Sequence, residues 1–136
     1  MDLATGRVTV DHVTVAHDVG TIINPLAVEG QLEGGVVMGV GFALKERFVP
    51  WKTTDFSQYR IPRSKETPGI EIVALNTPHE HCPFGAAGAG ECAQMPTAPA
   101  ITNAIFDACG VRVRSLPVTA IELRSLLEEA TKGRLT

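Results

Sequence analysis

The stretch INPLAVEGQLEGGVVMGVGFALKERF, residues 23–48, decides the fold of this chain. Asn24 is a good helix-capping residue, and Pro25 suits the first helical turn because its missing N–H group costs nothing there. Apolar residues then recur at four-residue intervals, which predicts a long helix with one apolar face. The residues of this stripe are Val28, Leu32, Val36, Val40 and Leu44.

Glycine interrupts this predicted helix five times, at Gly30, Gly34, Gly35, Gly39 and Gly41. Each interior glycine costs about 0.5–1 kcal/mol relative to alanine. We therefore expect a close contact that offsets the cost, made either by another backbone segment or by a flat ligand. Dimerisation within a membrane is a poor alternative, because charged and polar residues flank the glycines.

Two strands are predicted on either side of this helix. Residues 6–20 alternate apolar and polar side chains, and the alternation changes parity near Asp11 and His12, which indicates a bulge or a change of sheet. Residues 70–75 form the second strand. Between them, residues 50–69 contain three prolines and predict a polar arm on the surface or on a partner. So few strands indicate that the chain is part of a larger assembly.

Two further helices, separated by a short extended piece at residues 111–118 (VRVRSLPV), complete the pattern. One begins at Thr97 and ends at Gly110, a residue typical of helix C-termini. The last helix begins at Thr119, which forms a capping box with Glu122, and ends before Gly133. The sequence predicts one α+β domain over residues 1–136, with few strands packed against three helices.

Composition and charge exclude several classes of protein. The chain has 136 residues, of which 44% are hydrophobic and 20% charged, as in an ordinary globular domain. A net charge of −3 argues against nucleic acid or an anionic membrane as a partner. Because the sequence has neither an apolar run of about 18 residues nor a signal-peptide pattern, we expect no membrane span and a cytoplasmic location.

The stretch FGAAGAGECAQMPTAP, residues 84–99, is the main candidate for a binding site. Its small side chains let the backbone come close to a large ligand. The exposed N–H groups and the helix that follows favour phosphate or another electron-rich group. A Rossmann fingerprint is excluded, because the preceding residues NTPHEHCPF are not an apolar strand.

Glu91 is the only carboxylate in this stretch. Small apolar neighbours predict a desolvated side chain with a raised pKa, suited to act as a general base near neutral pH. The alternative is that Glu91 only interacts with the dipole of the following helix. Gln31, on the glycine-rich helix, has an amide that suits hydrogen bonding to a ligand, although exposed helical glutamines are common.

Cysteine and histidine give weaker signals. The spacing of Cys82, Cys92 and Cys109 fits neither a disulfide framework nor a CxxC metal site, so buried thiols are the simplest interpretation. Three cysteines are also too few for an iron–sulfur cluster. His79 and His81 beside Cys82 suit zinc chemically, but the pattern is a weak signal and a plain surface loop is the preferred interpretation.

Together, two long segments resemble a known family. HDVGTIINPLAVEGQLEGGVVMGVGFAL (17–44) and PFGAAGAGECAQMPTAPAITNAIFDACGVRVRSLPVT (83–119) are similar to the C-terminal part of the molybdopterin-binding large subunit of the xanthine dehydrogenase, aldehyde oxidase and carbon monoxide dehydrogenase family. The resemblance extends from about Gly6 to Leu126. Its specific motifs are NPxxVEGQxEGG and the GxGE loop followed by PTAPAITNAI.

This resemblance implies the C-terminal portion of a molybdenum-cofactor-binding domain in a molybdenum hydroxylase. Such enzymes hydroxylate an aldehyde or an N-heterocyclic carbon with water as the oxygen source. Glu91 maps onto the glutamate that takes the proton from a hydroxyl ligand of molybdenum. The implied contacts to a molybdenum-pyranopterin, with the cytosine dinucleotide form favoured, are Gln31, Ala86, Ala87, Gly88, Ala89 and Gly90. Many relatives have a basic residue where this chain has Ala87.

The resemblance also implies partners. The family's subunit is several times longer, so the remaining large-subunit portion is one expected partner. Iron–sulfur clusters and FAD are expected only on an iron–sulfur subunit and a flavin subunit, and the substrate is a small molecule. The alternative hypothesis is a non-catalytic assembly module, a homo-oligomer that associates through the glycine-rich helix and an exposed strand edge.

Overall fold

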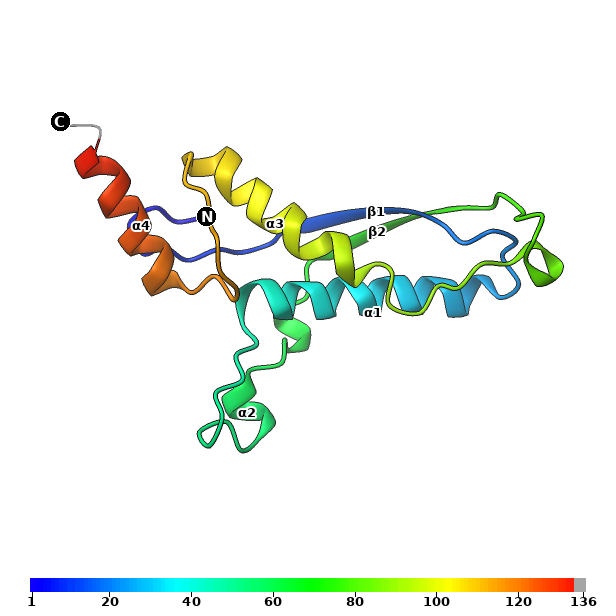
Figure 1. The fold of residues 1–136 in the computed structure, drawn as a ribbon, viewed down its shortest axis with the longest axis horizontal. Coiled ribbons are helices and arrows are strands. Elements are labelled where there is room, and N and C mark those ends of the chain that lie inside the picture. Colours follow the sequence, from blue (N-terminus) through cyan, green and yellow to red (C-terminus); the bar gives the residue numbers. More distant parts are fainter. Residues whose placement is uncertain (134–136) are drawn as a thin grey trace.

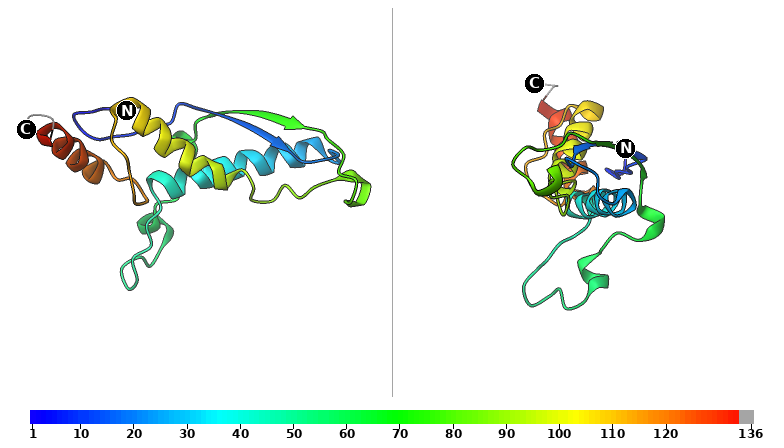
Figure 2. Two further views of the ribbon diagram at one scale, coloured as in Figure 1. Left: turned by 45° about the horizontal axis from the view of Figure 1, so that its top comes forward. Right: turned by 90° about the vertical axis from the view of Figure 1, so that its right-hand side faces the viewer.

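The computed structural model describes residues 1–133 of the chain and shows an elongated α+β arrangement. Two strands, β1 and β2, run beside the long helix α1, and α3 lies against the same region (Figure 1). Helix α4 lies at one end, and an arm that contains the short helix α2 projects from the body in each view of Figure 2. Among residues 1–133, no helix is long and apolar enough to cross a membrane.

Strands β1 (His12–Asp18) and β2 (Gly69–Leu75) pair in parallel. His12 lies opposite Gly69, and Asp18 lies opposite Leu75. The second predicted strand is confirmed, but only half of the first is. Residues 8–11 are not in the strand, so the change of parity occurs before β1 begins and needs no bulge. Val8 and Val10 nevertheless pack against the core.

Helix α1 (Pro25–Leu44) forms as predicted. The side chain of Asn24 accepts a hydrogen bond from the N–H of Ala27, at 3.1 Å, and so caps the helix. The central residues of the apolar stripe are buried, and both ends of the stripe are partly buried. This face of α1 forms the hydrophobic core together with β1, β2 and α3.

Close packing between α1 and α3 (Gln94–Cys109) explains two of the helical glycines. A Cβ atom added to Gly39 would lie 2.5 Å from Cβ of Thr97, and one added to Gly35 would lie 2.9 Å from Cβ of Ala93. The predicted close approach of another backbone is confirmed at these positions. Because α3 occupies the face of Gly35 and Gly39, that face of the helix is not free for the self-association that the assembly hypothesis proposed.

Gly30 and Gly34 lie on a different face of α1. A Cβ atom added to either would have no neighbour within 4 Å. No contact within the described chain therefore offsets the cost of these two glycines. Their open surface is available to a ligand or to another polypeptide segment.

Two boundaries differ from the sequence prediction. Helix α3 begins at Gln94, three residues before Thr97, although it ends as predicted with Gly110 in a left-handed conformation at a φ of 72°. The predicted arm contains a single-turn helix, α2 (Phe56–Tyr59). Its cap is Asp55, whose carboxylate accepts hydrogen bonds from the N–H groups that begin the turn.

Helix α4 (Ala120–Gly133) begins with the predicted capping box. The carboxylate of Glu122 accepts hydrogen bonds from the hydroxyl and the N–H of Thr119, at 2.7 and 3.2 Å. The Thr119 hydroxyl in turn accepts a bond from the N–H of Glu122 at 3.2 Å. The two bonds that the carboxylate accepts, above all the one from the Thr119 hydroxyl, lower the pKa of Glu122 below its ordinary value of 4.5.

Replacing Thr119 with alanine is expected to lower the free energy of unfolding by about 1 kcal/mol at neutral pH. Because the pKa of Glu122 is lower in the folded state, the stabilisation is complete above the unfolded pKa and is lost as the pH falls through the folded pKa. Urea unfolding at about pH 7 and about pH 3.5 should therefore show a smaller difference between the variant and the wild type in acid. Thr9→Ala, at an exposed position, is the control and should show no such difference.

Candidate functional site

The site lies at the end of the molecule where both strands finish. The parallel strands β1 and β2 point the same way, so residues 19–24 and 76–87 meet beyond their carboxyl ends, and residues 88–93 then return beside α1 to the start of α3 (Figure 1). The carboxyl ends of parallel strands are a common location for ligand sites in α/β sheets. The small-residue loop, defined here as residues 84–90, is part of this region.

Main-chain hydrogen bonds fix the small-residue loop beside the end of β1. The N–H of Thr21 donates to the carbonyl of Gly85 at 2.8 Å, and the N–H of Ala87 donates to the carbonyl of Val19 at 2.9 Å. An isolated antiparallel bridge joins Gly20 to Ala86 in the same place. The path of the loop is thus set largely by backbone contacts.

Asp18 organises the same region, and its role was not anticipated from the sequence. Its carboxylate accepts hydrogen bonds from the N–H of Gly20, at 2.9 Å, and from the N–H of Thr77, at 3.4 Å. The bond from Gly20 is the main reason why the pKa of Asp18 lies below its ordinary value. The signal available in the sequence was an aspartate two residues before a glycine at a strand end, which is typical of an Asx-turn.

Gln31 and the small-residue loop come together in space. The side-chain amide of Gln31 donates to the carbonyl of Gly90 at 3.4 Å, although the two residues are 59 positions apart. The contact is long for a hydrogen bond, and the Gln31 side chain is exposed. Two parts of the predicted site, one on α1 and one on the loop, are therefore neighbours.

The end of this loop offers unused hydrogen-bond donors. Among residues 1–133, none accepts a hydrogen bond from the N–H groups of Gly88, Ala89, Gly90 or Glu91. A Cβ atom added to Gly88 or Gly90 would have no neighbour within 4 Å. Bare backbone with free N–H groups fits a large ligand that carries electron-rich atoms, as a pterin cofactor does.

Glu91 follows this loop directly and precedes α3. Its carbonyl accepts a hydrogen bond from the N–H of Gln94 at 3.2 Å, which places the residue just before the first helical turn. Its side chain is exposed, so the expectation of a desolvated carboxylate is wrong for this chain. The reason is that the glycines and alanines of the loop are too small to cover it.

The carboxylate of Glu91 is also uncommitted. It makes no hydrogen bond with any described residue, including the first N–H groups of α3. Helix capping therefore does not account for this side chain, and it is free to act on a group placed beside the loop.

The sequence also raised His79, His81 and Cys82 as candidate metal ligands. Within the described part of the chain, no group of three His, Cys, Asp or Glu residues is arranged to hold a metal ion. The three cysteines are free and partly buried.

Phe84, which no sequence signal distinguished, has a φ of 55° and a side chain that is 90% exposed.

Comparison with known proteins gives a consistent result. Residues 1–68 match the family described as "Molybdopterin cofactor-binding domain". The chain is 39% identical over 137 residues to a nicotinate dehydrogenase subunit of Pseudomonas putida, covering 98% of this chain and 11% of that protein. It is 41% identical over 119 residues to "Aldehyde oxidoreductase" of Megalodesulfovibrio gigas, covering 86% of this chain and 13% of that protein.

Solved structures agree with the sequence matches. The fold superposes on "Aldehyde Oxidoreductase from Desulfovibrio gigas (MOP)" with a TM-score of 0.90 and 39% identity, covering 93% of this chain and 14% of that chain. The fold and the sequence matches thus define a segment of a molybdenum-cofactor-binding domain. The chain belongs to the xanthine dehydrogenase, aldehyde oxidase and carbon monoxide dehydrogenase family of molybdopterin-binding subunits. It spans only 11% and 13% of the two curated relatives described above.

Proposed function

We propose that this chain supplies part of the molybdenum-pyranopterin site, and the catalytic base, of a molybdenum hydroxylase. The observation that carries the proposal is the combination of free N–H groups at residues 88–91 with an uncommitted Glu91 carboxylate. The reaction is the oxidative hydroxylation of an aldehyde or N-heterocyclic carbon, with water as the source of oxygen. The substrate class is supported by the names of the matched relatives, an aldehyde oxidoreductase and a nicotinate dehydrogenase.

Each residue of the site has a distinct role in this proposal. When bound, the molybdenum group supplies a Lewis acid and a two-electron acceptor. The backbone N–H groups of residues 88–90 hold electron-rich atoms of the cofactor, and the small side chains of Ala86 and Ala87 allow the main chain to come close. Gln31 donates from its amide at the same edge. Glu91 accepts a proton from water activated in the site, as a general base.

The proposed enzyme requires more of the large subunit than the residues of this chain. We propose that the remaining large-subunit portion closes the site over Glu91, since the described chain leaves this carboxylate exposed. Iron–sulfur and flavin groups would lie on partner subunits and would accept the electrons, and the cofactor would be the cytosine dinucleotide form. The Pseudomonas putida relative is itself named as a subunit, which supports a multisubunit assembly.

Leucine at Gly88 or Gly90 tests whether the bare loop contacts a cofactor. Because both positions have open space in the described chain, each variant should keep the thermal stability of the isolated chain. After assembly with the remaining subunits, molybdenum and pterin content should fall at least several-fold, because the leucine side chain would occupy cofactor volume.

Ser115→Leu, at an exposed position away from the loop, is the matched control and should retain full molybdenum. Elemental analysis together with pterin fluorescence measures both components. Full cofactor content in the Gly88 and Gly90 variants would contradict the assignment of the loop.

A further inference from the structure

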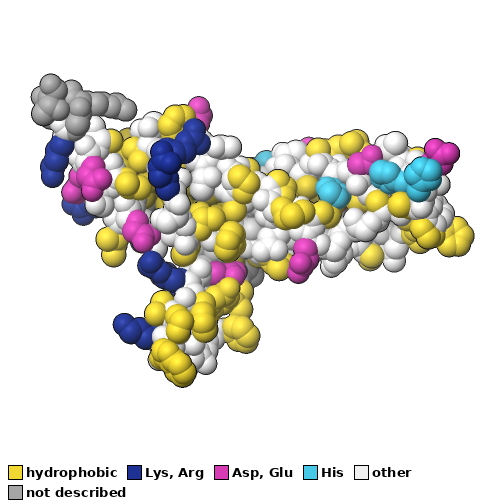
Figure 3. Space-filling view, in the orientation of Figure 1, with side chains coloured by type: hydrophobic (Ala, Val, Ile, Leu, Met, Phe, Trp, Pro, Cys, Tyr) yellow, Lys and Arg dark blue, Asp and Glu magenta, His cyan; other side chains and the backbone are white. Residues whose placement is uncertain are grey.

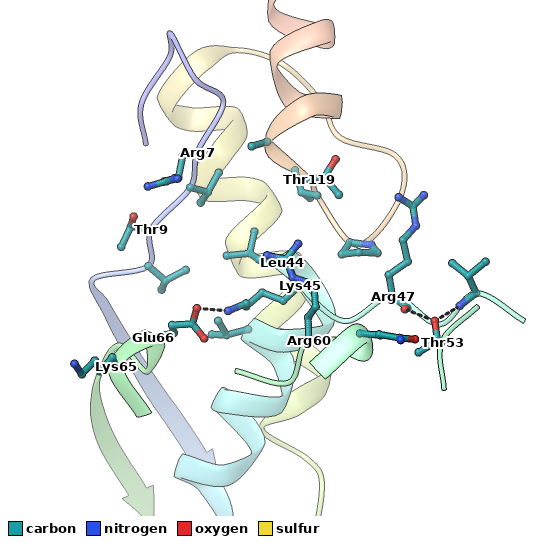
Figure 4. A pocket seen from close by; sticks show the side chains of 18 of the residues that line it. Arg7, Thr9, Leu44, Lys45, Arg47, Thr53, Arg60, Lys65, Glu66 and Thr119 are labelled. Carbon is teal, nitrogen blue, oxygen red and sulfur yellow. Dashed lines mark hydrogen bonds and ion pairs between the residues drawn. The ribbon is translucent and has the colours of Figure 1, made fainter. Parts of the chain in front are cut away.

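A large cavity lies far from Glu91, at the carboxyl end of α1 (Figure 4). Its volume is about 880 Å³. The walls come from residues 7–10, the end of α1, the arm, and residues 117–120. Gln31 and the end of α1 at Leu44 are separated by roughly 20 Å of helix, so this cavity is distinct from the proposed cofactor site.

Positive charge is concentrated around this cavity, which is called the basic cavity below. Six of the chain's 12 Lys and Arg residues line it, although the whole chain carries a net charge of −3. They are Arg7, Lys45, Arg47, Lys52, Arg60 and Lys65. Figure 4 shows Arg7 and Thr9 on one side, Arg47 and Thr53 on the other, and Lys45 between them. Such a concentration of one sign creates a local field that attracts anionic groups.

Only part of this charge is compensated within the chain. Among the described residues that line the cavity, Glu66 is the one carboxylate, and it forms an ion pair with Lys45. Nη2 of Arg47 lies 3.5 Å from Oε1 of Glu122, and an exposed ion pair of this kind contributes little to stability. The other four cations form no ion pair with the described residues: Arg7, Lys52, Arg60 and Lys65.

Apolar groups accompany the charges. The floor of the basic cavity is formed by aliphatic side chains, among them Val8, Val40 and Val118. On the arm, Trp51 is 100% exposed and Phe56 is 75% exposed. Figure 3 shows hydrophobic side chains gathered over the arm, with Lys and Arg side chains where the arm meets the body. Exposed aromatic patches of this kind mark binding surfaces.

We infer that the basic cavity and the arm dock an acidic segment of the large-subunit portion that lies outside residues 1–136. This inference rests on the proposed function and names the contact surface of that partner. The matching structure is a chain of which this one covers 14%, so most of such a subunit is available to supply the segment. A segment with Asp and Glu residues around an apolar anchor matches both the charged walls and the aliphatic floor. A small anion would leave the floor and Trp51 uncovered.

Zero-length carbodiimide cross-linking tests the contact directly, because the reagent joins lysine only to a carboxylate in direct contact. The chain is mixed with the separately produced remaining portion of the large subunit. Lys52 and Lys65 should couple to one Asp- and Glu-rich segment of that portion, identified by mass spectrometry. Coupling of these lysines to a second copy of this chain, or to no segment, would overturn the inference.

Charge reversal provides the quantitative test. The double variant Arg60→Glu and Lys65→Glu should bind the remaining portion at least tenfold more weakly in low salt. Its binding should also respond less to added salt. The matched double variant Arg114→Glu and Lys132→Glu makes the same change in net charge at exposed positions away from the basic cavity, and it should bind within twofold of the wild type. Equal binding by both double variants would contradict the inference.

The molybdenum content of the assembled protein separates this inference from the proposed function. If the chain docks specifically but the assembled protein contains no molybdenum, the basic cavity is confirmed as a docking surface and the proposed cofactor site is refuted. Full molybdenum with no effect of charge reversal would refute the surface alone.

Discussion

Replacing Glu91 with glutamine is expected to lower the turnover of the assembled enzyme by about 10²–10⁴-fold, the usual contribution of a general base. Glutamine has nearly the same shape but cannot accept the proton. The side chain makes no hydrogen bond within residues 1–133, so the substitution should not disturb the fold. Molybdenum content and the melting temperature should equal those of the wild type, which separates a catalytic defect from a defect in assembly.

Glu80→Gln is the matched control for this experiment. Glu80 is another exposed carboxylate in the same end region, eleven residues before Glu91. Its loss should leave turnover within about twofold, since a charge away from the reacting atoms has little effect on a proton transfer. If the Glu91 variant kept wild-type turnover with full molybdenum, Glu91 would not be the base.

The second large effect is expected on the stability of the fold, when the contact between α1 and α3 is disturbed. Gly39→Ala should lower the free energy of unfolding by about 1–3 kcal/mol, as overpacked cores do. The nearest atom to the new methyl group would be Cβ of Thr97, which cannot move away without separating α1 from α3. Trimming Thr97 to alanine should therefore not rescue the variant, because alanine keeps the same Cβ atom.

Gly34→Ala, on the same helix, is expected to change the free energy of unfolding in the opposite direction. Its position is open, so alanine should stabilise the isolated chain by about 0.5–1 kcal/mol through helix propensity. Denaturant unfolding of both variants measures the contrast. Equal destabilisation at Gly34 and Gly39 would contradict the explanation of Gly39 by its contact with α3.

The predictable parts of the fold were those with local causes. Capping by Asn24, the four-residue apolar period of α1 and the capping box at Thr119 are short-range patterns, and the structure confirms all of them. The start of β1 was wrong because alternating valines pack against the core at Val8 and Val10 without pairing with a second strand. Strand pairing depends on distant residues, which a local pattern does not contain.

For the candidate site too, local features were predictable from the sequence and long-range contacts were not. The residue types of the small-residue loop and the isolation of Glu91 were visible in the sequence. The contact between Gln31 and Gly90 was not predicted from spacing, because it joins positions 59 residues apart. The prediction of a desolvated Glu91 is wrong for the described chain, because its small neighbours do not cover the side chain and so do not exclude water from it.

The backbone bridge between Gly20 and Ala86 has a consequence for engineering. Gly20 and Gly85 both have positive φ values, of 65° and 73°, and a Cβ atom on Gly20 would meet the Gly85 carbonyl, so neither position tolerates exchange. Ala86 and Ala87 are held by main-chain bonds that any residue except proline can make. A larger side chain at either position should accordingly leave the path of the main chain unchanged, so substitutions there probe the space beside the loop without disturbing the scaffold beneath it.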